Sequence, residues 1–87
     1  DNISLKDQVI AFPNPAIDIL NVIVTSEMLV GINLFDVNGK KVYSCLDCFG
    51  VYDNHYMEID VSTLRSGVYV LTVETAESKI IEKITIQ

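Results

Sequence analysis

Hydrophobic and polar residues alternate with a period of two along most of the chain, and turn-forming residues separate the alternating stretches. A period of two is typical of β-strands, because successive side chains of a strand point to opposite faces. No stretch has a convincing helical period. The pattern predicts strands over residues 9–12, 17–25, 29–37, 41–45, 55–61, 67–75 and 78–87. About seven strands at near-regular spacing predict an all-β domain, an immunoglobulin-like β-sandwich.

The predicted strand over residues 17–25 is apolar on both of its faces. One face carries Leu20, Val22 and Val24, and the other carries Ile17, Ile19 and Ile23. The predicted strand over residues 67–75, by contrast, places Tyr69, Leu71 and Val73 on one face. A strand that is apolar on both sides of a small sandwich indicates an outer face that is covered or is available to a partner.

Proline and glycine mark the expected turns. Pro13-Asn14-Pro15 follows the first strand, and two prolines with fixed φ and no N–H predict a rigid corner there. Asn38-Gly39 predicts a two-residue hairpin turn of type I′, because both residues tolerate positive φ. Gly67 begins the sixth predicted strand, and we expect positive φ or a close backbone approach there.

Length and charge restrict the function classes. The chain has 87 residues, which is the size of one small domain, and its hydrophobic fraction of 49% is sufficient for a core. Its net charge is −6, with six basic residues. This charge argues against a nucleic-acid binder and against attraction to anionic lipid, because both need a cationic surface. No apolar run approaches the roughly 20 residues of a membrane-spanning helix.

The cysteine pair Cys45 and Cys48 forms a Cys-x-x-Cys motif. A structural zinc site needs four ligands, and besides the two cysteines the sequence offers His55 as its only histidine ligand. A redox motif of the thioredoxin type needs a helix N-terminus, and the pattern predicts none. We therefore favour a local disulfide or two buried free thiols over a metal or redox role.

No other group of residues indicates catalysis. Glu58 and Asp60 share one face of a predicted strand and could in principle serve acid–base chemistry or bind calcium. A solvated outer face is the preferred interpretation of this pair, and His55 alone indicates a surface or packing residue. We expect no catalytic residue, no metal and no cofactor.

Four segments follow one another in a recognisable order. They are Phe12-Pro13-Asn14-Pro15-Ala16 with Asp18 and Leu20, then Leu34-Phe35-Asp36-Val37-Asn38-Gly39-Lys40, then Ile59-Asp60-Val61-Ser62-Thr63-Leu64 with Ser66-Gly67-Val68-Tyr69-Val70-Leu71, and finally Lys83-Ile84-Thr85-Ile86-Gln87. In this order and spacing they resemble the C-terminal sorting domains of the type IX secretion system. The chain departs from the family pattern at Phe12 and Phe35, where tyrosine is usual, at Gln87, where lysine is frequent, and in having the cysteine pair.

The resemblance implies a transport function. Residues 9–87 would form the sorting domain, and residues 1–8 would be a linker near a processing site. The domain would follow a passenger protein in the periplasm of a Gram-negative bacterium of the Bacteroidota, where the outer-membrane translocon recognises it. A sortase-like cysteine peptidase would then remove the domain, and the passenger would remain at the cell surface or outside the cell.

The resemblance also assigns roles to residues. The expected recognition residues are Lys83, Ile84, Thr85, Ile86 and Gln87 of the last strand and Asn38, Gly39 and Lys40 of the hairpin. The residues expected to maintain the fold are Pro13, Asn14, Pro15, Asp36, Gly67 and Tyr69. The chain stops at Gln87, directly after a predicted strand, and this placement suits a signal read at the C-terminus. An exposed edge strand predicts recognition by strand addition, and it could also pair two copies of the domain, with Ile19 and Ile23 in support.

An adhesive or carbohydrate-binding β-sandwich module of a secreted protein is the alternative function. It predicts that the isolated domain binds a glycan or a host protein, and that the mature protein retains the domain. A small enzyme, the third class of function, has no supporting group of residues in the sequence.

Overall fold

The fold is all-β in the computed structural model, which describes residues 8–25, 29–46, 54–76 and 79–87. The strands are β1 (Gln8–Phe12), β2 (Ile19–Thr25), β3 (Leu29–Phe35), β4 (Lys41–Leu46), β5 (Asn54–Asp60), β6 (Gly67–Thr75) and β7 (Lys79–Ile86). Each expected strand is present, with bounds within two residues of the prediction. The described residues contain no helix, and hence none long and apolar enough to cross a membrane.

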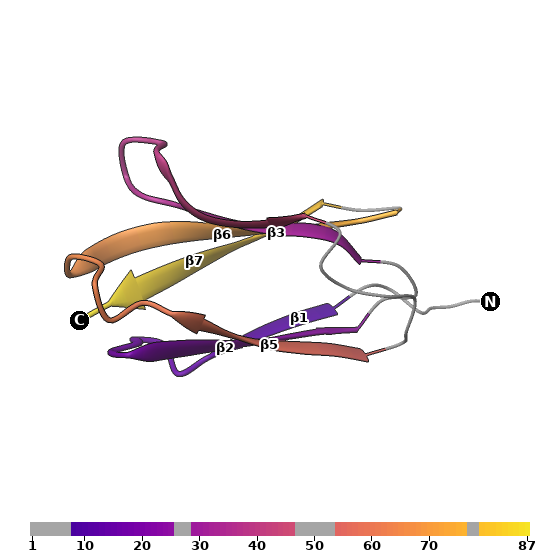
Figure 1. Ribbon diagram of the computed structural model, residues 1–87, viewed down its shortest axis with the longest axis horizontal. Helices are drawn as coiled ribbons and strands as arrows, with labels where there is room; N and C mark the ends of the chain where they lie inside the picture. Colours follow the sequence, from indigo (N-terminus) through magenta and orange to yellow (C-terminus); the bar gives the residue numbers. More distant parts are fainter. Residues whose placement is uncertain (1–7, 26–28, 47–53, 77–78) are drawn as a thin grey trace.

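The strands form two antiparallel sheets that lie face to face (Figure 1). One sheet has three strands in the order β1-β2-β5, and the other has four in the order β4-β3-β6-β7. The chain therefore crosses between the layers after β2, after β4 and after β5. The expected fold class is thus observed at the level of an all-β arrangement of two packed sheets.

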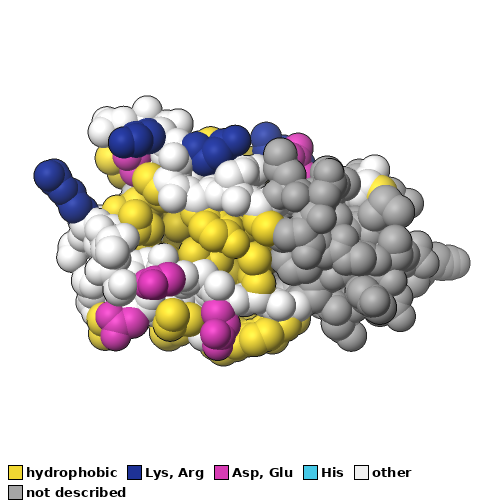
Figure 2. All heavy atoms as spheres, in the orientation of Figure 1, with side chains coloured by type: hydrophobic (Ala, Val, Ile, Leu, Met, Phe, Trp, Pro, Cys, Tyr) yellow, Lys and Arg dark blue, Asp and Glu magenta, His cyan; other side chains and the backbone are white. Residues whose placement is uncertain are grey.

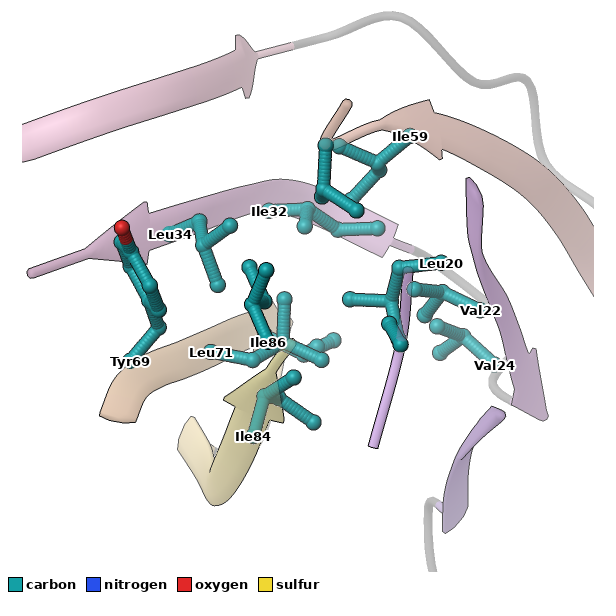
Figure 3. Packing of buried hydrophobic residues seen from close by; sticks show 13 residues of the cluster. Leu20, Val22, Val24, Ile32, Leu34, Ile59, Tyr69, Leu71, Ile84 and Ile86 are labelled. Carbon is teal, nitrogen blue, oxygen red and sulfur yellow. The ribbon is translucent and has the colours of Figure 1, made fainter. Parts of the chain in front are cut away.

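The core lies between the two sheets and takes side chains from the inner strands β2, β3 and β6 and from the edge strands β5 and β7. Its fully or almost fully buried hydrophobic side chains are Ala16, Leu20, Val22, Val24, Ile32, Leu34, Ile59, Val61, Tyr69, Leu71, Val73, Ile84 and Ile86. Side chains from both layers point into the same space (Figure 3). Each buried Leu, Ile or Val stabilises the fold by about 1.5–3 kcal/mol relative to an exposed side chain. The alternation in the sequence is therefore the cause of the two-layer packing.

Strand β2 has the two apolar faces that the sequence predicts. Leu20, Val22 and Val24 are buried in the core, whereas Ile19 remains 37% exposed on the opposite face and Ile23 is half-buried. The strand begins at Ile19 rather than at residue 17, and the carbonyl oxygen of Asp18 accepts a hydrogen bond of 2.8 Å from the N–H of Val61. The outer face of β2 therefore stays apolar and accessible.

Candidate functional site

The last strand, β7, lies at an edge of the four-stranded sheet, where β6 is its antiparallel neighbour. Its side chains alternate in burial along residues 83–87. Ile84 and Ile86 are 1% exposed and belong to the core, Thr85 is half-buried, and Lys83 and Gln87 are exposed. Of the five recognition residues expected on this strand, two therefore anchor it, and three present atoms to the surface.

The corner formed by Pro13, Asn14 and Pro15 packs against the outer edge of β7. The side chain of Asn14 accepts a hydrogen bond of 2.9 Å from the N–H of Thr85, and its Nδ2 lies 3.3 Å from the carbonyl oxygen of Lys83, to which it donates. The amide of asparagine here replaces the two backbone groups of a neighbouring strand. We call this pair of hydrogen bonds the Asn14 clamp.

Ala16 continues the pairing beyond the Asn14 clamp. Its N–H donates to the carbonyl oxygen of Thr85 at 2.8 Å, and its carbonyl oxygen accepts from the N–H of Gln87 at 2.8 Å. The bridge between Ala16 and Ile86 is parallel, and the side chain of Ala16 is fully buried. The chain on either side of residue 16 therefore links the edge of the four-stranded sheet to the start of β2.

These contacts correct the expectation of an open edge at residues 83–87. The outward backbone groups of Lys83, Thr85 and Gln87 that the clamp and Ala16 engage are already hydrogen-bonded within the domain. A receptor strand could pair with them only after displacing the corner. The correction has a simple cause: a rigid proline corner is short enough to lie along the edge, and a buried alanine holds it there.

The hairpin between β3 and β4 has a different turn from the expected one. The N–H of Gly39 donates to the carbonyl oxygen of Asp36 at 3.0 Å, so the turn is centred on Val37 and Asn38 instead of Asn38 and Gly39. Oδ1 of Asp36 accepts from the N–H groups of Asn38 and Lys40, each at 2.9 Å. Gly39 has a φ of 83°, which leaves it as the left-handed residue that closes the turn.

The reason for this difference is the side chain of Asp36. The carboxylate accepts hydrogen bonds from two backbone N–H groups of the loop, and these bonds stabilise the wider turn. A two-residue type I′ turn would not provide them. The same turn explains why aspartate and glycine stand three residues apart in the hairpin segment. Lys40 is exposed at its end, and Nζ of Lys41 lies 5.9 Å from the centre of the Phe35 ring.

The two expected recognition segments lie at the same end of the four-stranded sheet (Figure 1). Phe35 pairs with both Lys41 and Val70, and Val70 pairs with Lys83, so these four residues form one row across the sheet. The hairpin turn leaves β3 just beyond this row, and the last residues of β7 lie beyond it on the other side of β6. The structure thus places both segments at one end, with β3 and β6 between them.

The connection between β5 and β6 carries a second structural contact. The hydroxyl group of Tyr69 donates a 2.7 Å hydrogen bond to the carbonyl oxygen of Arg65, four residues earlier. Gly67 has a φ of 154°, a region that other residues rarely adopt, and Leu64 packs against the core. Gly67 therefore has the positive φ that the sequence predicts, and Tyr69 is buried in the core, as its place in the alternation predicts.

The outer face of the three-stranded sheet joins Tyr56, Asn21 and Glu58. The Tyr56 hydroxyl lies 2.6 Å from Oδ1 of Asn21 and 3.1 Å from Oε2 of Glu58. Partial desolvation, followed by the hydrogen bond and the charge of Glu58, raises the pKa of Tyr56. Sequence reasoning missed Tyr56 and Asn21, because they are 35 residues apart and only the strand register brings them together.

Asp60 has a local structural role. Its Oδ1 accepts from the Ser62 hydroxyl at 2.6 Å and from the Ser62 N–H at 2.9 Å, and these hydrogen bonds lower the pKa of Asp60. Glu58 and Asp60 do share one exposed face, as expected. The described residues contain no group of three or more His, Cys, Asp or Glu side chains that could hold a metal ion.

The cysteine pair is only partly described. Cys45, on β4, is disulfide-bonded, so the alternative of a buried free thiol is wrong for this residue. Cys48 lies outside the described residues, and the expected pairing of the two stays a prediction. The backbone of His55 pairs with Val24 in the three-stranded sheet. Neither position joins the segments at the end of the four-stranded sheet.

Comparison with models of protein families gives one finding. Residues 10–87 match a family described as "Secretion system C-terminal sorting domain". The match begins on β1, includes the proline corner, and extends to the last residue of the chain. No curated protein matches the chain.

Proposed function

The chain belongs to the family of secretion system C-terminal sorting domains, and we propose that it acts as a removable sorting signal, which the type IX secretion machinery recognises while the domain is folded. The single observation that carries the proposal is the family match over residues 10–87. A domain of this family is a C-terminal sorting signal for type IX secretion, and it implies a passenger protein that is exported across the outer membrane. Such a domain is not itself a catalyst.

We propose that recognition takes place at the end of the four-stranded sheet that holds the hairpin and the last strand. Lys40 and Lys83 are both exposed there, and Thr85 is half-buried, with its N–H bonded to Asn14 of the proline corner. Ile84 and Ile86 would act indirectly, by fixing β7 in the core. The surface read by the translocon would then be a shaped part of the folded domain, with the edge of β7 already closed.

The arrangement of the sheets supports an immunoglobulin-like fold for this sorting domain. The sheet orders β1-β2-β5 and β4-β3-β6-β7 are compatible with a sandwich of that class. The hydrogen bond from Tyr69 to the carbonyl oxygen of Arg65, near the start of β6, has the form of the tyrosine corner of such sandwiches. We propose this class on these two observations together.

Removal of the domain is a further part of the proposal. We propose that the linker of residues 1–8 ends where Gln8 pairs with Thr25 at the start of β1, and that a sortase-like cysteine peptidase cuts near this linker after transit through the periplasm. This step rests on the family resemblance. In the proposed sequence of events the domain is a substrate of the peptidase and contributes no catalytic group.

The experiment compares a full-length passenger protein with and without residues 8–87 in a cell that has the type IX machinery. The passenger should reach the cell surface only when the domain is present, as measured by protease accessibility on intact cells. Equal surface delivery of the passenger that lacks the domain would refute the proposed function.

A second comparison tests where the signal is read. Deleting residues 83–87 would also remove Ile84 and Ile86 from the core, so the deletion confuses recognition with folding. Lys83→Glu changes only an exposed side chain, and Lys79→Glu makes the same change at the other end of β7. Lower delivery for Lys83→Glu than for Lys79→Glu is expected; equal delivery would move the recognition site away from residue 83.

The second candidate function, an adhesive or carbohydrate-binding module, has one observation in its favour. Phe12 and Tyr56 are 41% and 56% exposed on the outer face of the three-stranded sheet, where aromatic side chains could contact a ligand. This function predicts that the mature secreted protein keeps the domain. Mass spectrometry of the mature passenger separates the two functions, because a sorting signal that has been removed is absent from the mature protein.

A further inference from the structure

The outer face of the three-stranded sheet carries an apolar patch that the fold leaves uncovered. In the strand registers, Ile10, Ile23 and Tyr56 form one row across β1, β2 and β5, and Phe12, Asn21 and Glu58 form a second row. Ile19 on β2 pairs with Asp60 on β5. We call these eight residues the Tyr56 face. The residues within each row point to the same side of the sheet, because paired residues of antiparallel strands share a face.

Exposure is concentrated on this face. Among the described residues eight large hydrophobic side chains are exposed, and Ile10, Phe12, Ile19 and Tyr56 belong to the Tyr56 face. Ile17, two residues before β2, is also 60% exposed but lies outside the strand registers that define this face. If a large side chain presents roughly 200 Å² when fully accessible, the four on the Tyr56 face expose on the order of 400 Å². Apolar patches of this size on a single domain are frequently binding sites.

Hydrogen bonds hold the centre of the Tyr56 face in one geometry. The Tyr56 hydroxyl is 2.6 Å from Oδ1 of Asn21, and Nδ2 of Asn21 donates to the carbonyl oxygen of Phe12 at 3.1 Å. This chain of contacts crosses all three strands, from β5 over β2 to β1. An aromatic side chain that is already ordered loses little entropy on binding, and such side chains dominate the energy of protein interfaces.

The charge of the face restricts what can cover it. Strands β1, β2 and β5 contain no Lys or Arg, and Glu58 and Asp60 are exposed on the Tyr56 face. The four-stranded sheet instead carries exposed Lys41, Lys79 and Lys83 together with Glu74 and Glu82, so the basic side chains of the described strands lie on one layer only, whereas acidic side chains lie on both (Figure 2). A partner surface with Lys or Arg around an apolar centre would complement the Tyr56 face.

A second copy of the domain is a poor occupant by the same criterion. In a twofold dimer each face meets its own copy, which would bring Glu58 and Asp60 near the same carboxylates of the other protomer. The net charge of −6 adds further repulsion between copies. The occupant therefore has to be a different molecule that supplies positive charge.

We propose that the Tyr56 face docks a protein of the secretion machinery through an apolar surface rimmed by Lys or Arg. The inference rests on the proposed function, and it adds a second contact surface on the opposite layer from the hairpin and the last strand. The two layers would then have separate partners: the acidic, apolar layer binds the basic-rimmed protein, and the layer with the exposed lysines presents residues 38–40 and 83–87.

The test uses the full-length passenger with its sorting domain. The double variant Ile10→Lys/Glu58→Lys places two positive charges on the Tyr56 face. Its matched control, Ile81→Lys/Glu74→Lys, changes the same residue types and the same net charge on the four-stranded sheet, where Ile81 is 62% exposed. We expect at least a tenfold fall in the surface-delivered fraction for the first variant, with accumulation in the periplasm, and normal delivery for the control.

A folding check keeps the result interpretable. Ile10→Ser adds no charge and removes apolar atoms from a side chain that is 56% exposed on the edge strand β1. It should leave the thermal midpoint of the domain within a few degrees and still reduce delivery. If the double variant proves to be unfolded, Ile10→Ser alone decides: normal delivery overturns the inference, and reduced delivery supports it.

The remaining outcomes each contradict the inference in a different way. Normal delivery of the Tyr56-face variants, while loss of the whole domain abolishes delivery, overturns the docking surface and leaves the proposed function intact. Equal loss in the control variant shows an effect of net charge alone. Sedimentation of the isolated chain as a dimer that Ile10→Lys dissociates would identify a second copy as the occupant, and glycan binding that Ile10→Ser abolishes would identify a carbohydrate.

Discussion

Replacing Asn14 by alanine should loosen the last strand without changing the core. The substitution removes both hydrogen bonds of the Asn14 clamp, the 2.9 Å bond from the N–H of Thr85 and the 3.3 Å bond to the carbonyl oxygen of Lys83. Pro15 and Pro13 restrict the backbone on both sides, so alanine changes the unfolded chain little. Ala16, which pairs with the same edge, remains in place.

The size of the effect follows from the geometry of the two bonds. A net contribution of about 0.5–1 kcal/mol each, at the lower end because both are exposed, gives a loss of roughly 1–2 kcal/mol in the free energy of unfolding. A loss of 1 kcal/mol lowers the thermal midpoint of a domain of this size by about 4–8 °C. A domain of 87 residues has a total stability of roughly 4–13 kcal/mol, so the variant should still fold.

Hydrogen exchange of individual amides is the decisive assay. The N–H of Thr85 points away from β6, across the edge of the sheet, to Asn14. The N–H groups of Ile84 and Ile86 point toward β6, because the direction alternates along an antiparallel strand. In Asn14→Ala all amides should lose protection by the global factor of about 5–30. Thr85 should lose considerably more, since its acceptor is gone.

Two further variants show whether the clamp is the cause. Asn14→Asp keeps an acceptor for the N–H of Thr85 but turns a carboxylate oxygen toward the carbonyl oxygen of Lys83, so it should preserve the protection of Thr85 while still lowering the midpoint. Asn38→Ala, in the exposed hairpin, should change the free energy of unfolding by less than about 0.5 kcal/mol. The reasoning is refuted if Thr85 and Ile84 lose protection by the same factor in Asn14→Ala.

Three other predictions concern the turns. Tyr69→Phe removes the bond to the carbonyl oxygen of Arg65 and should cost about 1–2 kcal/mol in urea denaturation; an unchanged midpoint would contradict the role of the hydroxyl. Gly67→Ala should cost about 1–3 kcal/mol through backbone strain alone, because the added Cβ meets no atom within 4 Å at a φ of 154°, and calorimetry measures it. The lowered pKa of Asp60 adds stability above the pKa of an unfolded aspartate, and this stability is lost as the pH falls through the folded pKa; Ser62→Ala should weaken this acid dependence in urea titrations between pH 7 and pH 2.

The strands could be predicted because their signal is local. The burial of Leu71 and Val73 or of Ile84 and Ile86 is already visible as alternation along a single strand. The tyrosine corner is local too, since Tyr69 and its acceptor Arg65 are four residues apart. The sequence predicts a buried Tyr69 but not the acceptor of its hydroxyl group, because burial follows from alternation whereas the acceptor depends on the path of the preceding connection.

Contacts that depend on long-range register could not be predicted from the sequence. The Asn14 clamp joins residues 71 positions apart, and no local pattern indicates that a proline corner will lie along the final strand. The predicted type of the hairpin turn is wrong for a different reason. Asn38-Gly39 does favour a two-residue turn, but the carboxylate of Asp36 accepts two N–H groups and stabilises a wider one.

The clamp also changes what a signal at the end of this fold can be. A strand with free backbone groups would be read by pairing, which depends little on side chains. Here Asn14 and Ala16 occupy those groups along residues 83–87, so a receptor of the folded domain meets the side chains of Lys83 and Thr85 together with the proline corner. Residues at the two ends of the described chain thus form one surface, and a change near residue 14 should affect delivery even when the last five residues are intact.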